Sequence, residues 1–259
     1  MNNHFVWNID PSIFTIGGFG PRWYSVLFAC AFIASFYLVQ YIFKRENKPV
    51  ETIDSLLIYM VLGTVIGARL GHVFFYDPGY YLSHPLEIVM VWKGGLASHG
   101  AGIGILTATY LFCKKHNFNF LWSVDRLVIP IALSGAFIRL GNFFNSEILG
   151  IPSSAPWAVI FSRIDMVPRH PVQLYESFCY AIIFIVLFFI YRKNTYKPRP
   201  GLLFGTFLVL VFSVRLTLEA FKSKQASFEP AMALSMGQWL SLPFLMVGIF
   251  FIVRAIKSK

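Results

Sequence analysis

Residues 23–43 read WYSVLFACAFIASFYLVQYIF, and this stretch decides the class of the fold because it contains no Asp, Glu, Lys or Arg. A helix that crosses the hydrocarbon core of a bilayer needs roughly 20 consecutive apolar residues. Arg22 precedes the stretch, and Lys44 and Arg45 follow it, so charged residues mark both of its ends. The stretch therefore predicts a membrane-spanning helix.

Comparable apolar runs recur along the whole chain. Of the 259 residues, 56% are hydrophobic and 13% are charged, whereas a soluble domain carries about 25% charged residues. The sequence predicts an all-α integral membrane protein of about seven transmembrane helices, which form a single membrane domain over residues 1–259. The expected spans lie near residues 23–43, 53–75, 94–112, 124–144, 172–191, 202–221 and 237–254.

The basic residues indicate how these spans are oriented, because Lys and Arg collect in cytoplasmic loops. One set of alternate loops is rich in them: Lys44, Arg45, Lys48, Lys114, Lys115, Arg192, Lys193, Lys197, Arg199, Arg254, Lys257 and Lys259. The other set is poorer: Arg22, Arg163, Arg169, Lys222 and Lys224. We therefore expect the N-terminus outside and the C-terminus in the cytoplasm. The same rule accounts for the net charge of +10, so we expect no nucleic-acid partner.

The cysteines and the N-terminus give two further expectations. Cys30, Cys113 and Cys179 have no Cys or His at metal-binding spacing, so we expect no metal site. The N-terminus lacks a basic segment followed by a cleavable apolar core, so we expect no removed signal peptide.

The polar residues within the spans gather at one depth. In the expected orientation they fall in the outer half of the membrane: Tyr24, Arg69, His72, His99, Arg139, Asn142, Glu147, Gln173, Glu176, Arg215 and Glu219. The inner half has little beyond Asp54, Asp125 and Arg126. Such residues usually face the interior of a bundle or a wet cavity. Because the planar guanidinium group suits phosphate, the pattern predicts a site for a phospholipid head group toward the outer leaflet.

Several of these residues also have a purely structural interpretation. Arg215 and Glu219 stand four residues apart and can form an ion pair that fixes helix packing. Arg69 can extend along its apolar stem to the outer surface, and His99 can be a hydrogen-bonded structural histidine. Asn142 can join helices through amide hydrogen bonds. Tyr24 can belong to the interfacial aromatic belt.

Two glycine-rich segments predict close approach of helices. Gly63, Gly67 and Gly71 recur every four residues, as in small-residue stripes that let another helix pack tightly. Residues 94–104 hold five glycines around His99, which would allow tight packing or a close approach of backbone to a ligand.

One segment also carries a family motif. Residues 139–150, RLGNFFNSEILG, resemble the G-R-x-x-N-F-x-N-x-E-x-x-G signature of the prolipoprotein diacylglyceryl transferases. Matching segments occur in order over nearly the whole chain: residues 23–24, 67–71, 94–100 and 168–176, Arg215 with Glu219, and residues 235–238. The chain departs from the family at Ile138, Ala101 and Ser146, where Gly is usual, and its outer loop at 151–168 is short.

The resemblance implies an activity and a set of residues. The family transfers the diacylglyceryl group of phosphatidylglycerol to the lipobox cysteine thiol of a prolipoprotein signal peptide, forming a thioether and releasing glycerol phosphate. It works in the bacterial inner membrane and needs no metal or soluble cofactor. The resemblance implies that His99, Arg139 and Arg215 are catalytic, with His99 as the base. The implied substrate-binding residues are Tyr24, Arg69, Arg139, Asn142, Glu147, Gly150 and Glu219.

Three other functions fit part of the pattern. A different lipid acyltransferase or phosphotransferase would use the same outer-leaflet site and release other products. A transporter or flippase for a lipid-linked anion needs polar residues across the whole membrane, and the inner half has few. A non-catalytic scaffold would not need three buried arginines at one depth.

Overall fold

The computed structural model describes residues 4–15, 17, 20–195, 199–223 and 235–257. About 72% of the chain is helical, and among the described residues six helices are long and apolar enough to cross a membrane. The expectation of an all-α, multi-pass membrane protein is therefore confirmed. Three basic residues used to orient the loops, Lys197, Lys224 and Lys259, lie outside the described residues.

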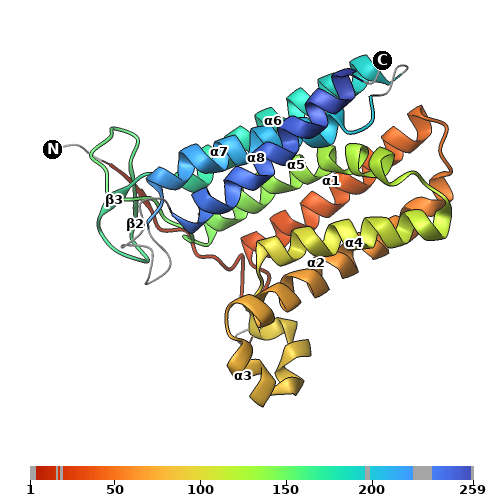
Figure 1. Cartoon of the computed structure of the whole chain (residues 1–259). Coiled ribbons are helices and arrows are strands. Elements are labelled where there is room, and N and C mark those ends of the chain that lie inside the picture. Colours follow the sequence, from red (N-terminus) through yellow and green to blue (C-terminus); the bar gives the residue numbers. More distant parts are fainter. Residues whose placement is uncertain (1–3, 16, 18–19, 196–198, 224–234, 258–259) are drawn as a thin grey trace. The chain divides into compact units, whose positions relative to one another are not determined.

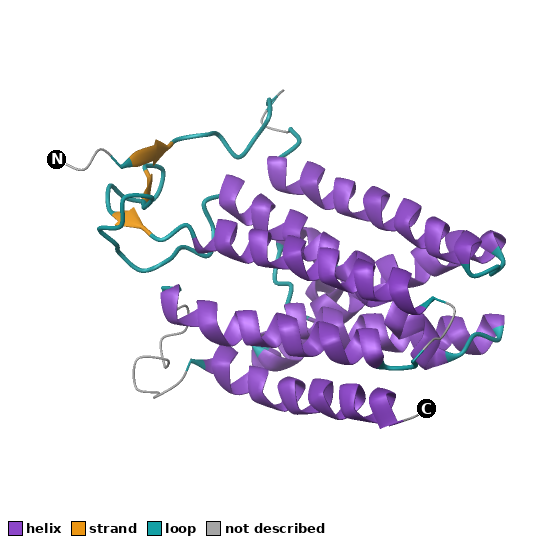
Figure 2. Cartoon of the chain, turned by 90° about the horizontal axis from the view of Figure 1, so that it is seen from above, coloured by secondary structure: helices purple, strands orange, loops and turns teal. Residues whose placement is uncertain are grey.

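Over the described residues, the regular structure is helical apart from three short strands (Figure 2). The elements are β1 (Phe5–Trp7), α1 (Trp23–Arg45), η1 (Val50–Thr52), α2 (Ile53–Phe75), α3 (Pro78–Ser83), η2 (Pro85–Val89), η3 (Val91–Lys93), α4 (Ser98–His116), α5 (Phe120–Phe144), β2 (Val159–Phe161), β3 (Pro168–Arg169), α6 (Val172–Asn194), α7 (Leu202–Leu218), η4 (Glu219–Phe221) and α8 (Met236–Lys257). The chain forms two compact units, and the expectation of a single membrane domain stays a prediction.

The six candidate spans are α1, α2 with the preceding turn, α5, α6, α7 with η4, and α8. The remaining long helix, α4, has 19 residues and is not one of them. It begins at Ser98, four residues later than expected, because Gly94 and Gly95 have φ values of +86° and +72° and so cannot belong to a right-handed helix. The seventh span and the orientation of the chain stay predictions.

The first unit comprises Met1–Leu38 and Leu127–Lys259. Helix α7 contacts both α6 and α8, and it approaches α8 so closely that a methyl group on Gly205 would lie 2.7 Å from the carbonyl oxygen of Gly248. The unit also holds the β-sheet, which lies beyond the ends of these helices (Figure 1).

This small sheet was not expected from the sequence. Strand β1 pairs in parallel with β2, and β2 pairs antiparallel with β3. Its apolar face packs on the last turn of α5, where Trp7 lies 4.3 Å from Phe143 between ring centroids and joins Val159 and Phe161 in a buried cluster. The sheet therefore holds the end of α5 that carries the family motif.

The second unit comprises Val39–Arg126. Helices α2 and α4 lie side by side in it, and the connection through α3 projects beyond the end of α2 (Figure 1). The glycine stripe explains this packing, since a methyl group on Gly67 would lie 2.7 Å from the Cα atom of Gly104, and one on Gly71 would lie 2.6 Å from that of Gly100. The two backbones are in direct contact, as the stripe predicted.

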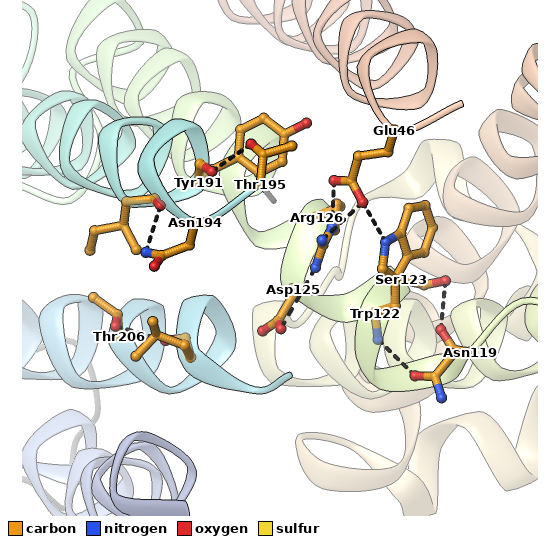
Figure 3. A network of polar contacts seen from close by, with 12 residues as sticks. Glu46, Asn119, Trp122, Ser123, Asp125, Arg126, Tyr191, Asn194, Thr195 and Thr206 are labelled. Atoms are coloured by element: carbon orange, nitrogen blue, oxygen red, sulfur yellow. Dashed lines mark hydrogen bonds and ion pairs between the residues drawn. The ribbon is translucent and has the colours of Figure 1, made fainter. Parts of the chain in front are cut away.

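A buried ion pair lies where α1 ends and α5 begins (Figure 3). Both Nε and Nη2 of Arg126 donate to the carboxylate of Glu46 at 2.9 Å, and Nε1 of Trp122 donates to the same group at 2.7 Å. The Arg126 guanidinium also lies 5.1 Å from the centre of the Trp122 ring. Because each charge is paired and hydrogen-bonded, both can be buried here.

We predict that Gly67→Ala destabilises the protein by about 1–3 kcal/mol, since the added methyl group overpacks the contact between α2 and α4. The measurement is thermal unfolding of the purified protein in detergent. Gly102→Ala is the matched control on α4, because nothing lies within 4 Å of a methyl group there. Equal stability of both variants would contradict backbone contact between the two helices.

Candidate active site

Arg139 lies in the penultimate turn of α5 and is held by groups from two helices. Its Nε atom forms an ion pair with Oε2 of Glu176 on α6 at 3.1 Å. Its Nη1 donates to Oδ1 of Asn142, three residues further along α5, at 3.4 Å. The side chain of Glu176 is only 1% exposed, whereas that of Arg139 is 18% exposed. The Glu176 carboxylate is therefore the buried partner, and the side chain of Arg139 is partly exposed.

Lys222 is a second cation of this network. Its Nζ atom lies 2.9 Å from Oε1 of Glu176 and donates to Oε2 of Glu219 at 3.1 Å. From its sequence position Lys222 was expected to be only a loop residue, so this role was not predicted. Its position three residues after Glu219, directly after η4, was the available signal.

The predicted ion pair between Arg215 and Glu219 is wrong. Glu219 pairs with Lys222 instead, and a methyl group on Gly237 of α8 would lie 2.6 Å from Oε1 of Glu219, so that helix confines the carboxylate. The Nε atom of Arg215 is buried and has no hydrogen-bond partner among the described residues. Arg215 therefore keeps a donor that a ligand could use.

Glu147 joins the same network from the loop after α5. Asn142 donates to its Oε2 at 3.2 Å and Asn145 to its Oε1 at 3.1 Å, so both carboxylate oxygens accept from amides. Gln173, which is fully buried on α6, donates to the backbone carbonyl of Glu147 at 2.5 Å. A continuous chain of contacts thus runs through the network residues Glu219, Lys222, Glu176, Arg139, Asn142 and Glu147.

The backbone around Glu147 explains how its side chain reaches this position. The N–H of Glu147 donates to the carbonyl of Asn142, and the N–H of Ser146 donates to that of Phe143, which is the Schellman pattern at a helix end. The C′ residue of that pattern is left-handed, and Ser146 has φ +54°. Glycine adopts this conformation without strain, which explains why the family usually has Gly where this chain has Ser146.

Gly150 lies where three segments meet. A methyl group there would lie 2.8 Å from Cβ of His170 and 2.8 Å from Val172, so only glycine fits. Its carbonyl accepts from Oγ of Ser223 at 2.9 Å and from Arg169 at 3.3 Å. Arg169 also pairs with Asp165 outside the spans, where its guanidinium holds the pKa of that carboxyl below its usual range.

Tyr24 lies against the same end of α5. A methyl group on Gly141 would lie 2.8 Å from Cδ2 of the Tyr24 ring, so the absence of a side chain at Gly141 makes room for the tyrosine. The ring also stacks on Phe28 in the next turn of α1. The first unit therefore brings Tyr24 to the helix that carries Arg139 and Asn142.

Arg69 and His99 belong to the second unit. Arg69 is buried, and its guanidinium donates to four backbone carbonyls, those of Glu87, Ile88, Gly94 and Gly95. Arg69 thus stabilises the connection that leads into α4. A contact of Arg69 with substrate stays a prediction. His99 is exposed at the start of α4, and it has no hydrogen-bond partner among the described residues.

The fold and these residues define a multi-pass helical membrane protein with a buried network of alternating charges at one end of its first unit. The described residues contain no group of His, Cys, Asp and Glu that could hold a metal ion.

Comparison with known proteins then gives the family. The model of the prolipoprotein diacylglyceryl transferase family matches residues 11–254, and the chain belongs to this family. The phosphatidylglycerol–prolipoprotein diacylglyceryl transferase of Tolumonas auensis is 50% identical over 98% of both chains. The enzyme of that name from Chloroherpeton thalassium is 49% identical over 99% of this chain and 96% of its own. The one from Bacteroides fragilis is 39% identical over 100% and 99%.

We predict that Ser146→Gly stabilises the protein by about 1 kcal/mol, since it relieves the cost of a left-handed residue with a side chain. Thermal unfolding in detergent measures the change. Ser146→Ala is the control, because it removes the buried, unpartnered hydroxyl but keeps the backbone cost. If alanine stabilises as much as glycine, the hydroxyl and not the backbone is the source of the effect.

Proposed function

We propose that this protein transfers the diacylglyceryl group of phosphatidylglycerol to the lipobox cysteine of prolipoproteins, the first step of lipoprotein maturation. The observation that carries the proposal is the buried charge network around Arg139, which lies in the segment that matches the family signature. The names of the relatives, which match nearly the full chain, support the choice of both substrates.

The reaction requires two kinds of help from the protein. The cysteine thiol must lose its proton, and the resulting thiolate attacks the C3 carbon of the glyceryl group. A carbon–sulfur bond then forms while the bond between that carbon and the phosphate oxygen breaks, and glycerol phosphate leaves with the bonding electrons. A thiol has a pKa near 8.5 in water, so a base increases the reactive fraction, and cations favour the charge that gathers on the leaving group.

We assign these roles to the residues predicted from the sequence. His99 accepts the thiol proton, which is supported by its exposure and by its ring nitrogens, which have no hydrogen-bond partner among the described residues. Arg139 and Arg215 bind the phosphate, and the unpartnered Nε of Arg215 supports this role. Asn142 and Tyr24 orient the glycerol head group. The carboxylates of Glu147, Glu176 and Glu219 position the cations.

The proposed location is the bacterial inner membrane, with the site toward the outer leaflet. The charge network lies at the end of the first unit where α5 and α7 end and α6 and α8 begin. The opposite helix ends carry Arg192, Lys193, Arg254 and Lys257. By the positive-inside rule that basic end faces the cytoplasm, so the network faces outward.

We predict that the purified protein, supplied with phosphatidylglycerol and a synthetic lipobox peptide, increases the peptide mass by one diacylglyceryl group and releases glycerol phosphate. The increase is lost when the peptide cysteine is replaced by serine, because the thiol is the acceptor. Peptide mass spectrometry and glycerol phosphate measurement give the readout. Release of a different lipid product would indicate another transferase, and lipid binding without reaction would indicate a transporter.

We predict that Arg139→Ala lowers turnover about 10²- to 10³-fold, as expected when a group that stabilises transition-state charge is removed. We expect low turnover in Arg139→Lys as well, because lysine keeps the charge but loses the planar donor fork. Arg163→Ala is the control, since it removes an exposed arginine of the same unit whose ion-pair partner is Asp10. Unchanged turnover in either Arg139 variant would remove this residue from the mechanism.

A further inference from the structure

Two aromatic rings from the end of α2, those of Phe75 and Tyr76, contact His99. The Tyr76 ring stacks on the imidazole, with ring centroids 5.8 Å apart and an angle of 23° between the planes. The Phe75 ring meets it edge-on at 5.5 Å. Tyr76 also stacks on His72, one turn earlier, at 5.3 Å and 16°. All of these distances fall within the range of favourable ring contacts.

The backbone fixes the imidazole against these rings. A methyl group on Gly71 would lie 2.6 Å from the Cα atom of Gly100, so the backbone next to His99 touches α2 one turn before Phe75. The N–H of Ala97 donates to the carbonyl of Ala68 at 2.9 Å, which ties the start of α4 to the same helix. Main-chain contacts therefore hold the backbone that carries His99 next to the end of α2 that carries Phe75 and Tyr76.

Stacking takes the place of the usual orienting hydrogen bond. A histidine base is commonly held by a carboxylate or carbonyl that accepts from one ring nitrogen. Among the described residues His99 has no such partner, and its ordered contacts are with Tyr76 and Phe75. Ring contacts restrict the plane of the imidazole while both nitrogens stay available to other groups.

We propose that Tyr76 is a positioning residue for the reaction, and that its ring holds the His99 imidazole in the orientation in which it accepts the thiol proton. This inference rests on the proposed role of His99 as the base. Tyr76 acts through its ring face and not through its hydroxyl, which has no hydrogen-bond partner among the described residues.

The test compares three substitutions in the full-length protein. Tyr76→Ala removes the ring, and Tyr76→Phe keeps the ring and removes the hydroxyl. Phe74→Ala removes a neighbouring aromatic ring that is not one of the two in contact with His99. Tyr76 and Phe74 are 65% and 64% exposed, so each alanine variant loses a similar exposed ring and leaves no buried cavity. Thermal unfolding of each variant verifies that it is folded.

The first readout is the NMR spectrum of ring-labelled histidine in detergent micelles, with the His99 signal assigned by its loss in His99→Gln. We expect the shift caused by the stacked ring to disappear in Tyr76→Ala and to persist in Tyr76→Phe and Phe74→Ala. A His99 signal that does not move in Tyr76→Ala would overturn the stacking arrangement itself.

The second readout is the lipidation rate. We expect kcat to fall about tenfold in Tyr76→Ala with KM within twofold of the parent value, as expected when a reacting group is misoriented. Tyr76→Phe and Phe74→Ala should stay within twofold. A moved NMR signal with unchanged kcat would overturn the positioning role. Full turnover of His99→Gln would instead disprove the proposed base, and the NMR comparison would still decide whether Tyr76 orients the ring.

Discussion

The double ion pair of Glu176 is the interaction on which the candidate site depends. One carboxylate, almost fully buried on α6, holds Arg139 of α5 with one oxygen and Lys222 beyond α7 with the other. An isolated buried carboxylate would be very costly, whereas this one has a cation beside each of its oxygens. Loss of Glu176 would remove an ion pair from both cations at once, and Lys222 would keep only Glu219. Glu176 of α6 thereby connects α5 with the segment that follows α7, at the end of the first unit where the family motif lies.

The backbone supplies a second constraint at the same place. Ser146 and Ile148 both have positive φ, so the chain reverses sharply on either side of Glu147. A branched residue such as Ile148 rarely adopts this conformation, and surrounding contacts must hold it. The contacts present are the amide of Gln173 on the carbonyl of Glu147 and the packing of the small sheet against the end of α5. Regular helices thus provide the scaffold, and an irregular turn directs the Glu147 carboxylate toward Asn142 and Asn145.

Much of this arrangement could be predicted from the sequence, because long apolar runs specify spans and stray polar residues within them indicate a site. Arg139, Asn142 and Glu147 were named in that way, and the structure brings them together in one polar network. The sheet was missed because β1 and β2 have three residues each and are separated by most of the chain. The hydrogen bonds of Arg69 to main-chain carbonyls have no signature in the side-chain pattern. Lys222 was missed because it follows a predicted span and was counted only as a loop residue. These contacts depend on which backbone segments the fold brings together, and the residue types alone do not reveal them.

The charges around Arg139 have a consequence for how an anion can be held and released. Arg139 is paired with Glu176, and Lys222 is paired with both Glu176 and Glu219, so each of these two cations already has a carboxylate partner. In the proposed reaction, a phosphodiester must therefore compete with Glu176 and Asn142 for the donors of Arg139. The departing phosphate meets the same competition from these two groups.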